Sequence, residues 1–198
     1  MPWPQKKHSP IPNHAEKVFH GKRWQVLQWE QELFDGTKFT YESLKRHDSA
    51  SIIPVLQGDK VIILEERQPH WKKKEFSIVG GGIEEGEDVL LGAKRELLEE
   101  TGATFRDFYL VSAIEPFPSV DYTHYTFIAK NFIEQNETSL DPGEDITPIE
   151  VSFDKLISLA RNREFYYNPY LIDEYIIRDK IPEFFDMLRN PEKYVIGI

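Results

Sequence analysis

The chain has 198 residues, of which 40% are hydrophobic and 13% aromatic, enough for the core of one enzyme-sized domain with a small appendage. A formal net charge of -10 disfavours nucleic-acid binding, although a bound divalent cation would let an acidic site accept a small anionic substrate. The absence of cysteine excludes disulfides, thiolate nucleophiles and cysteine-based zinc sites. No apolar run approaches the roughly 20 residues of a membrane span, so we expect a cytoplasmic protein without membrane contact.

The N-terminal quarter predicts an arm followed by antiparallel β-structure. Prolines are frequent in the first dozen residues, where they disfavour regular hydrogen bonding. Residues 17–44 alternate polar with apolar or aromatic side chains, and Asp35-Gly36 is typical of a hairpin turn. We therefore predict that residues 1–47 form an arm and a small β segment. Residues 48–198 would form the main domain.

The main domain mixes strand and helix patterns, which predicts an α/β fold. Residues 51–56 and 60–64 are apolar and β-branched, and the turn residues Gln57-Gly58-Asp59 separate them. Further strands are expected at residues 108–113, 122–129 and 149–151. Helices are expected over residues 153–161 and again from Pro169, with Asn168 as the N-cap.

A helix with defined ends is predicted over residues 88–101. Asp88 suits the N-cap and Gly102 suits the C′ position. The glycines at 80–82 precede it, in a loop whose backbone can approach a ligand closely and offer a carbonyl to a metal ion. An apolar stripe that would pack the helix on a sheet is formed by Leu90, Ala93 and Leu97.

Carboxylates gather on one face of this helix. Because a helix turns by about 100° per residue, Glu96 and Glu100 lie one turn apart, with Glu99 beside them. Such clustering is costly without a cation, and carboxylate oxygens suit Mg²⁺ or Mn²⁺. These ions can bridge pyrophosphate oxygens and activate water. The helix therefore predicts a divalent metal site.

The acidic helix belongs to a longer pattern of fixed spacing. Gly81 is followed after five residues by Glu87 and, after seven more, by Arg95-Glu96-Leu97-Leu98-Glu99-Glu100-Thr101-Gly102-Ala103. The last run alone would also fit a solvated helix face with salt bridges, but the full spacing argues against chance. Arg95 can pair with Glu99 or brace the loop through Glu87, and we assign Arg95 and Glu87 to structural support.

The pattern resembles the Nudix box of the Nudix hydrolase superfamily at each charged and glycine position. Ala103 departs from it, since the family usually has a larger aliphatic residue there. The resemblance implies an α/β/α sandwich with a mixed central sheet, preceded in this chain by the small N-terminal antiparallel β segment. It also implies Mg²⁺-dependent catalysis, with Mn²⁺ as an alternative ion. The implied metal ligands are Glu96, Glu99, Glu100 and the Gly81 carbonyl, with Glu99 and Glu100 counted as catalytic.

Flanking features are similar to the ADP-ribose and ADP-sugar pyrophosphatase branch of that superfamily. They include the β segment, Glu66-Arg67-Gln68 before the box, and Pro116 and Pro118 after it. The likeness implies hydrolysis of ADP-ribose or a related nucleoside diphosphate sugar by a homodimer built through the β segment. It leaves open another substrate, such as a nucleoside triphosphate, a dinucleoside polyphosphate, NADH or coenzyme A. A nucleotide sensor without turnover is a further alternative, against which the intact box glutamates argue.

The branch also implies where the substrate would lie. Arg67 would contact a phosphate, with a plain surface role as the alternative. Trp29 would contribute to an adenine pocket, with ordinary sheet packing as the alternative. The catalytic base is expected at Glu144 in an acidic loop, which would otherwise have no catalytic duty. Glu115 is a further carboxylate that could face the substrate cleft.

Overall fold

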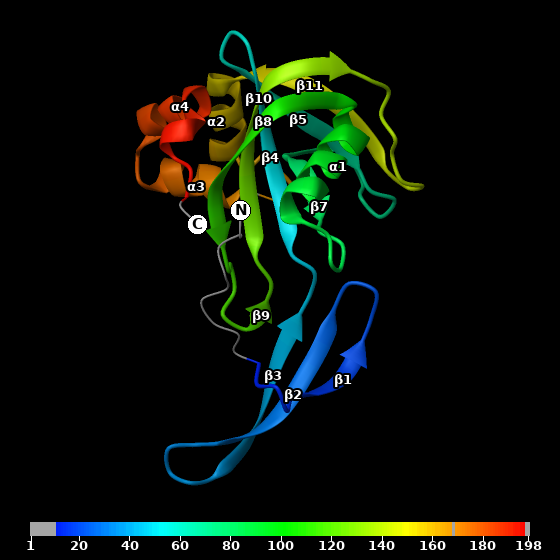
Figure 1. Ribbon diagram of the computed structural model, residues 1–198, viewed down its shortest axis with the longest axis vertical. Helices are drawn as coiled ribbons and strands as arrows, with labels where there is room; N and C mark the ends of the chain where they lie inside the picture. The colour runs from blue at the N-terminus through cyan, green and yellow to red at the C-terminus, as the bar shows by residue number, and fades with distance from the viewer. Residues whose placement is uncertain (1–10, 168, 197–198) are drawn as a thin grey trace.

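A computed structural model describes residues 11–167 and 169–196. The predicted arm up to residue 10 and the predicted cap Asn168 lie outside the described residues. A narrow N-terminal sheet extends from a larger sheet that carries helices on both faces (Figure 1). In the part of the chain that is described, no helix is long and apolar enough to cross a membrane.

The N-terminal sheet is an antiparallel meander, as the alternating pattern predicts. Its strands are β1 (Glu16–His20), β2 (Gln25–Glu32) and β3 (Lys38–Lys45). Gly36 has a φ of 83° and donates its N–H to the Leu33 carbonyl at 3.0 Å, which closes the predicted turn between β2 and β3. A short strand from the main body, β9 (Val120–Asp121), pairs in parallel with β3 and joins the two parts.

The central sheet has seven strands in the order β11-β5-β4-β10-β8, with β6 beside β5 and β7 beside β4. The strands are β4 (Ser49–Leu56), β5 (Lys60–Arg67), β6 (Glu75–Ser77), β7 (Val79–Gly82), β8 (Ala103–Ile114), β10 (His124–Gln135) and β11 (Asp145–Ser152). β4 and β10 run parallel, whereas β10 and β8 run antiparallel, so the sheet is mixed as predicted.

Three of these strands, β8, β10 and β11, are longer than their apolar runs indicated. Pro148 lies inside β11, opposite Leu64 of β5. Proline cannot donate to a ladder, but β11 is the end strand in the order and pairs with β5 on one side. Strand pairing therefore extends β11 through a residue that sequence patterns treat as a strand breaker.

Helices cover both faces of the central sheet (Figure 1). One face carries α1 (Val89–Thr101), and the other carries α2 (Phe153–Arg161), α3 (Tyr170–Ile177) and α4 (Ile181–Arg189), followed by the 3-10 turn η1 (Pro191–Lys193). The predicted tail helix from Pro169 is two helices, because Asp179 takes a left-handed conformation with a φ of 53°. This layering confirms the predicted α/β/α sandwich.

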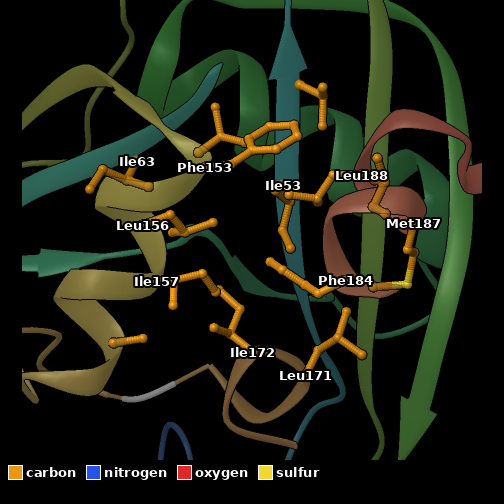
Figure 2. Close-up of a cluster of buried hydrophobic side chains, with 14 of the residues drawn as sticks. Ile53, Ile63, Phe153, Leu156, Ile157, Leu171, Ile172, Phe184, Met187 and Leu188 are labelled. Atoms are coloured by element: carbon orange, nitrogen blue, oxygen red, sulfur yellow. The ribbon is translucent and has the colours of Figure 1, made fainter. Parts of the chain in front are cut away.

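Each layer of helices closes its own hydrophobic core. Figure 2 shows the core beneath α2, α3 and α4, where Ile53 and Ile63 of the sheet lie in one cluster with Leu156. The core beneath α1 contains Ile52 of β4 and, from the helix, the fully buried Ala93 and Leu97. Neighbouring residues Ile52 and Ile53 serve opposite cores because successive strand side chains alternate. The second core holds α1 firmly beside β7.

Candidate functional site

The position of α1 is fixed by its two caps. The Asp88 side chain accepts the N–H groups of Leu90 and Leu91 at 3.0 and 3.1 Å. At the other end, Gly102 has a φ of 69° and donates its N–H to the Leu98 carbonyl at 2.8 Å. These bonds hold in place the turn that carries the acidic residues.

Glu100 is a buried carboxylate, 7% exposed, at the junction of α1 and β7. Its Oε2 accepts the backbone N–H of Gly80 at 2.7 Å. Burial raises the pKa of Glu100 well above its usual value, although the Gly80 hydrogen bond opposes that rise. Gly80 has a φ of 143°, and a Cβ there would lie 2.1 Å from the Ala50 carbonyl, so this close approach requires glycine.

Arg95, in the acidic helix α1, connects that helix to the glycine strand β7 and to the loop after it. Its Nε and Nη2 donate to the two carboxylate oxygens of Glu87, both at 3.0 Å. Nη2 also donates to the Gly82 carbonyl at 3.0 Å. Nη1 donates to Glu96 and Glu99 at 2.9 and 3.1 Å. The Arg95 hydrogen bonds lower the pKa of Glu87, which marks this pair as a stable ionic contact.

Four carboxylates from three parts of the chain come within electrostatic reach of one another. Burial raises the pKa of Glu66, near the end of β5, and the neighbouring charge of Glu144 adds to the rise. Burial also raises the pKa of Glu96, despite its Arg95 contact, and Glu99 and, to a smaller extent, Glu144 add to the rise. Glu96, Glu66 and Glu144 all add to the raised pKa of Glu100. We call this set, Glu66, Glu96, Glu100 and Glu144, the acidic cluster.

Glu96, Glu100 and Glu144 of the acidic cluster were predicted site residues from the sequence, whereas Glu66 was not. Glu66 stands in β5 opposite Glu75 of β6, and it reaches the box through tertiary structure alone. The sequence held one weak indication that Glu66 belongs to the site. It is a carboxylate near the end of a buried apolar strand, a short distance before the glycines in sequence. The glycines at 80–82 were predicted to form a loop, whereas they lie in strand β7, and Gly80 donates its N–H to Glu100.

A cleft of about 400 Å³ adjoins the acidic cluster through Glu144. The residues lining it come from β5 and the loop after it, and from β11 and the loop before it: Arg67, Gln68, Pro69, Trp71, Gly143, Glu144 and Asp145. Arg67 Nη2 lies 3.2 Å from Asp145 Oδ2. Glu144 Oε2 accepts the backbone N–H of Asp141 at 2.9 Å, which orients its side chain in the loop. The structure thus brings Arg67 and Glu144 to one cleft.

The other two predicted substrate-binding residues, Trp29 and Glu115, do not line this cleft, and neither do the predicted metal ligands. Trp29 is 9% exposed in the N-terminal sheet, where its ring packs 5.8 Å from that of Tyr41. Glu115 is exposed after the end of β8. Glu99, whose side chain is 41% exposed, stays on the surface of α1 in contact with Arg95.

The donor set fits a hard divalent cation by its chemistry. Burial, and to a smaller extent the neighbouring carboxylates, raises the pKa values of Glu96 and Glu100, so a cation would stabilise their charged forms, and their oxygens suit Mg²⁺ or Mn²⁺. The carboxylate oxygens are not yet arranged as a coordination sphere. In residues 11–167 and 169–196, no group of three acidic or histidine side chains has the geometry to hold a metal ion. Glu100 accepts a hydrogen bond from Gly80, and Glu96 and Glu99 accept hydrogen bonds from Arg95. A metal ion bound by these carboxylates would replace some of these hydrogen bonds.

A helix bearing clustered glutamates thus lies beside a glycine strand in an α/β/α sandwich. Residues 45–171 match the NUDIX domain family, and the chain therefore belongs to the Nudix family of hydrolases.

Several characterised proteins are similar to the chain. It is 26% identical to the ADP-ribose pyrophosphatase of Bacillus subtilis (strain 168) over 153 residues, which cover 76% of this chain and 83% of that protein. It is 25% identical to the methanol dehydrogenase activator of Bacillus methanolicus over 154 residues, covering 77% and 83%. A crystal structure of an ADP compounds hydrolase has the same fold, with a TM-score of 0.69 at 19% identity over 91% of this chain and 98% of that one.

Proposed function

We propose that the chain is a Mg²⁺-dependent pyrophosphatase that cleaves ADP-ribose or a related nucleoside diphosphate sugar. Water adds across the P–O–P linkage, which gives a nucleoside monophosphate and a sugar phosphate. The observation that carries the proposal is the acidic cluster beside the glycine strand, next to a cleft that holds Arg67. The similarity to an ADP-ribose pyrophosphatase supports the choice of substrate.

The proposed ligands of the ion are the carboxylates of Glu96, Glu99 and Glu100 and the carbonyl of Gly81. A bound Mg²⁺, or Mn²⁺ in its place, would supply positive charge that offsets the negative charge of the diphosphate. Arg95 and Glu87 support these groups, because their hydrogen bonds join the glycine strand and the loop after it to α1.

Glu144 is the proposed general base. It lies at the cleft and within electrostatic reach of the other members of the acidic cluster, and as a carboxylate it can accept a proton from the attacking water. Arg67 would donate hydrogen bonds to a phosphate after leaving its partner Asp145. Together these two side chains would orient water and diphosphate at the same cleft.

A substrate panel with Mg²⁺ tests this proposal. Initial rates would be compared for ADP-ribose, other nucleotide sugars, NADH, coenzyme A, dinucleoside polyphosphates and nucleoside triphosphates, using wild type and Glu100→Gln. We expect the highest kcat/KM with ADP-ribose or a related sugar, and loss of turnover in the variant. Preference for another compound would assign a different Nudix specificity. Binding without turnover in the wild type would indicate a nucleotide sensor.

We also propose that the N-terminal sheet mediates homodimerisation. Strand register places Trp29 and Gln31 opposite Tyr41 and Phe39, so the aromatic side chains share one face of that sheet. Phe39 is 58% and Tyr41 43% exposed, which leaves apolar area for a second copy to cover. The division of the chain near residue 47, a cytoplasmic location and the lack of nucleic-acid or membrane partners stay predictions.

A further inference from the structure

Aromatic side chains from two distant segments meet at the edge of the cleft. Trp71, in the loop between β5 and β6, stacks on Tyr166, which follows α2; their ring centroids are 3.8 Å apart and the rings are inclined by 28°. Tyr167 packs edge-on against Tyr166 at 4.5 Å. Trp71 itself is one of the residues that line the cleft.

The backbone holds this pair in place from both sides. Tyr166 donates its N–H to the Phe76 carbonyl of β6 at 2.9 Å, beside the buried Phe165, which forms a bridge with Phe76. Trp71 donates its N–H to the Gln68 carbonyl at 2.9 Å. The Trp71 backbone is therefore held within its own loop, and one face of its indole packs against a ring from another segment. A preorganised ring of this kind binds a planar group with little loss of side-chain entropy.

The position of Trp71 fits recognition of the group attached to the diphosphate. Arg67 and Glu144 line the same cleft, and Glu144 lies close to the rest of the acidic cluster. A ligand whose diphosphate lies at the acidic cluster would thus extend towards the indole. Planar bases stack on aromatic rings because every base presents a π-face.

We propose that Trp71, backed by Tyr166, is a specificity-determining residue that stacks on the base of the nucleoside diphosphate; this rests on the proposed function. Trp29 is in a different position, since its ring is 9% exposed and packed within the N-terminal sheet. Within the described residues, Trp71 is the tryptophan that lines the cleft.

The test compares binding of AMP and ribose 5-phosphate by titration calorimetry. The two ligands share the sugar and the phosphate and differ in the base, and neither requires turnover. We expect Trp71→Leu to weaken AMP binding about 10-fold, with ribose 5-phosphate changed less than about twofold and Trp71→Phe within about threefold of wild type for AMP. Phe132→Leu, at a half-exposed aromatic of β10 outside the cleft lining, should leave both affinities unchanged.

Three results would overturn this assignment. One is unchanged AMP affinity in a Trp71→Leu protein whose melting temperature matches wild type, and another is an equal loss for both ligands. The third is an AMP loss in Trp29→Leu but not in either Trp71 variant. If Trp71→Leu does not fold, Trp71→Gln, which also lacks an aromatic ring, takes its place in the same comparison of AMP with ribose 5-phosphate. If wild type binds AMP through Trp71 but hydrolyses no nucleotide sugar, the proposed function is contradicted, whereas the assignment of Trp71 as a base-stacking residue is supported.

Discussion

The carboxylate of Glu96 lies directly against the backbone of Gly81, where an added Cβ would stand 2.5 Å from Glu96 Oε2. Gly81→Ala therefore forces Glu96 away from its place in the acidic cluster. Because proposed metal ligands must be positioned within fractions of an ångström, we expect kcat/KM for ADP-ribose with Mg²⁺ to fall about 10-fold or more. Steady-state kinetics at saturating Mg²⁺ measures this loss.

The adjacent glycine provides a matched control. A Cβ at Gly82 would meet no atom within 4 Å, so Gly82→Ala should keep kcat/KM within about twofold of wild type. Equal losses in the two variants would show that flexibility of the loop, and not the position of Glu96, controls the rate.

Replacing Glu100 with glutamine should raise the stability of the protein while lowering its activity. Glutamine keeps an acceptor for the Gly80 N–H but removes a charge that is disfavoured by burial and by the rest of the acidic cluster. We expect Glu100→Gln to raise the melting temperature in chelator at pH 8 by about 2 °C or more. Hydrolysis should fall on the order of 100-fold. Thermal unfolding and initial rates on the same preparation test both effects.

Glu87→Gln is the contrasting variant. The pKa of Glu87 is lowered by its hydrogen bonds from Arg95, so its charged form is favoured in the folded protein. Loss of that charge should lower the melting temperature by about 2 °C or more. Equal shifts in Glu87→Gln and Glu100→Gln would contradict the electrostatic description of the site.

Much of this arrangement is predictable from local patterns. The caps Asp88 and Gly102 and the buried stripe of α1 are short-range signals, and the structure places them as the sequence indicates. The hairpin turns at Gly36 and Gly58 are equally local, since both residues adopt positive φ values. Elements with such signals were found close to their true bounds.

The remainder depends on contacts between distant segments. Glu66 joins the acidic cluster because β5 lies beside β4, which pairs with the glycine strand β7. Trp71 meets Tyr166 across almost half the chain, and no periodicity connects them. The continuation of β11 through Pro148 likewise depends on its place at the sheet edge. The sequence therefore indicated the box, and the family resemblance indicated Arg67 and Glu144, but neither gave Glu66 or Trp71 a place at the site.

His124 should make stability depend on pH. It is largely buried, its Nδ1 lies 2.9 Å from Ser49 Oγ, and burial, with a smaller effect from Arg46, lowers its pKa from 6.5 to about 4. The folded protein keeps the ring neutral, whereas the unfolded chain takes up a proton below pH 6.5. The stabilisation is therefore complete above pH 6.5 and is lost as the pH falls towards 4. The loss attributable to this group is at most about 3 kcal/mol.

The comparison variant is His124→Asn, whose amide can keep a hydrogen bond to Ser49. Urea unfolding at pH 5 and pH 7.5 would give the change in unfolding free energy for each protein. We expect a smaller change in the variant, because other groups titrate equally in both. The same pH dependence in both proteins would show that His124 is not protonated on unfolding in this range.

The aromatic face of the N-terminal sheet should control association. Phe39→Glu places a charge on the face shared with Trp29 and Tyr41, and we expect it to convert a dimer into a monomer at micromolar concentration. Thr40→Lys, on the opposite face beside Glu30, should leave the dimer intact. Light scattering coupled to size exclusion measures the mass. A monomeric wild type would contradict the proposed dimer.

Glu96, Glu99 and Glu100, beside the glycine strand, are the proposed carboxylate ligands of a divalent cation. Electron paramagnetic resonance of Mn²⁺ tests this assignment most directly, because the signal of the free ion disappears on binding. We predict that wild type and Glu134→Gln, an exposed substitution on β10, remove free Mn²⁺ equally well. A Glu96→Gln and Glu100→Gln double variant should remove far less. Undiminished Mn²⁺ binding by the folded double variant would contradict the assignment of the site.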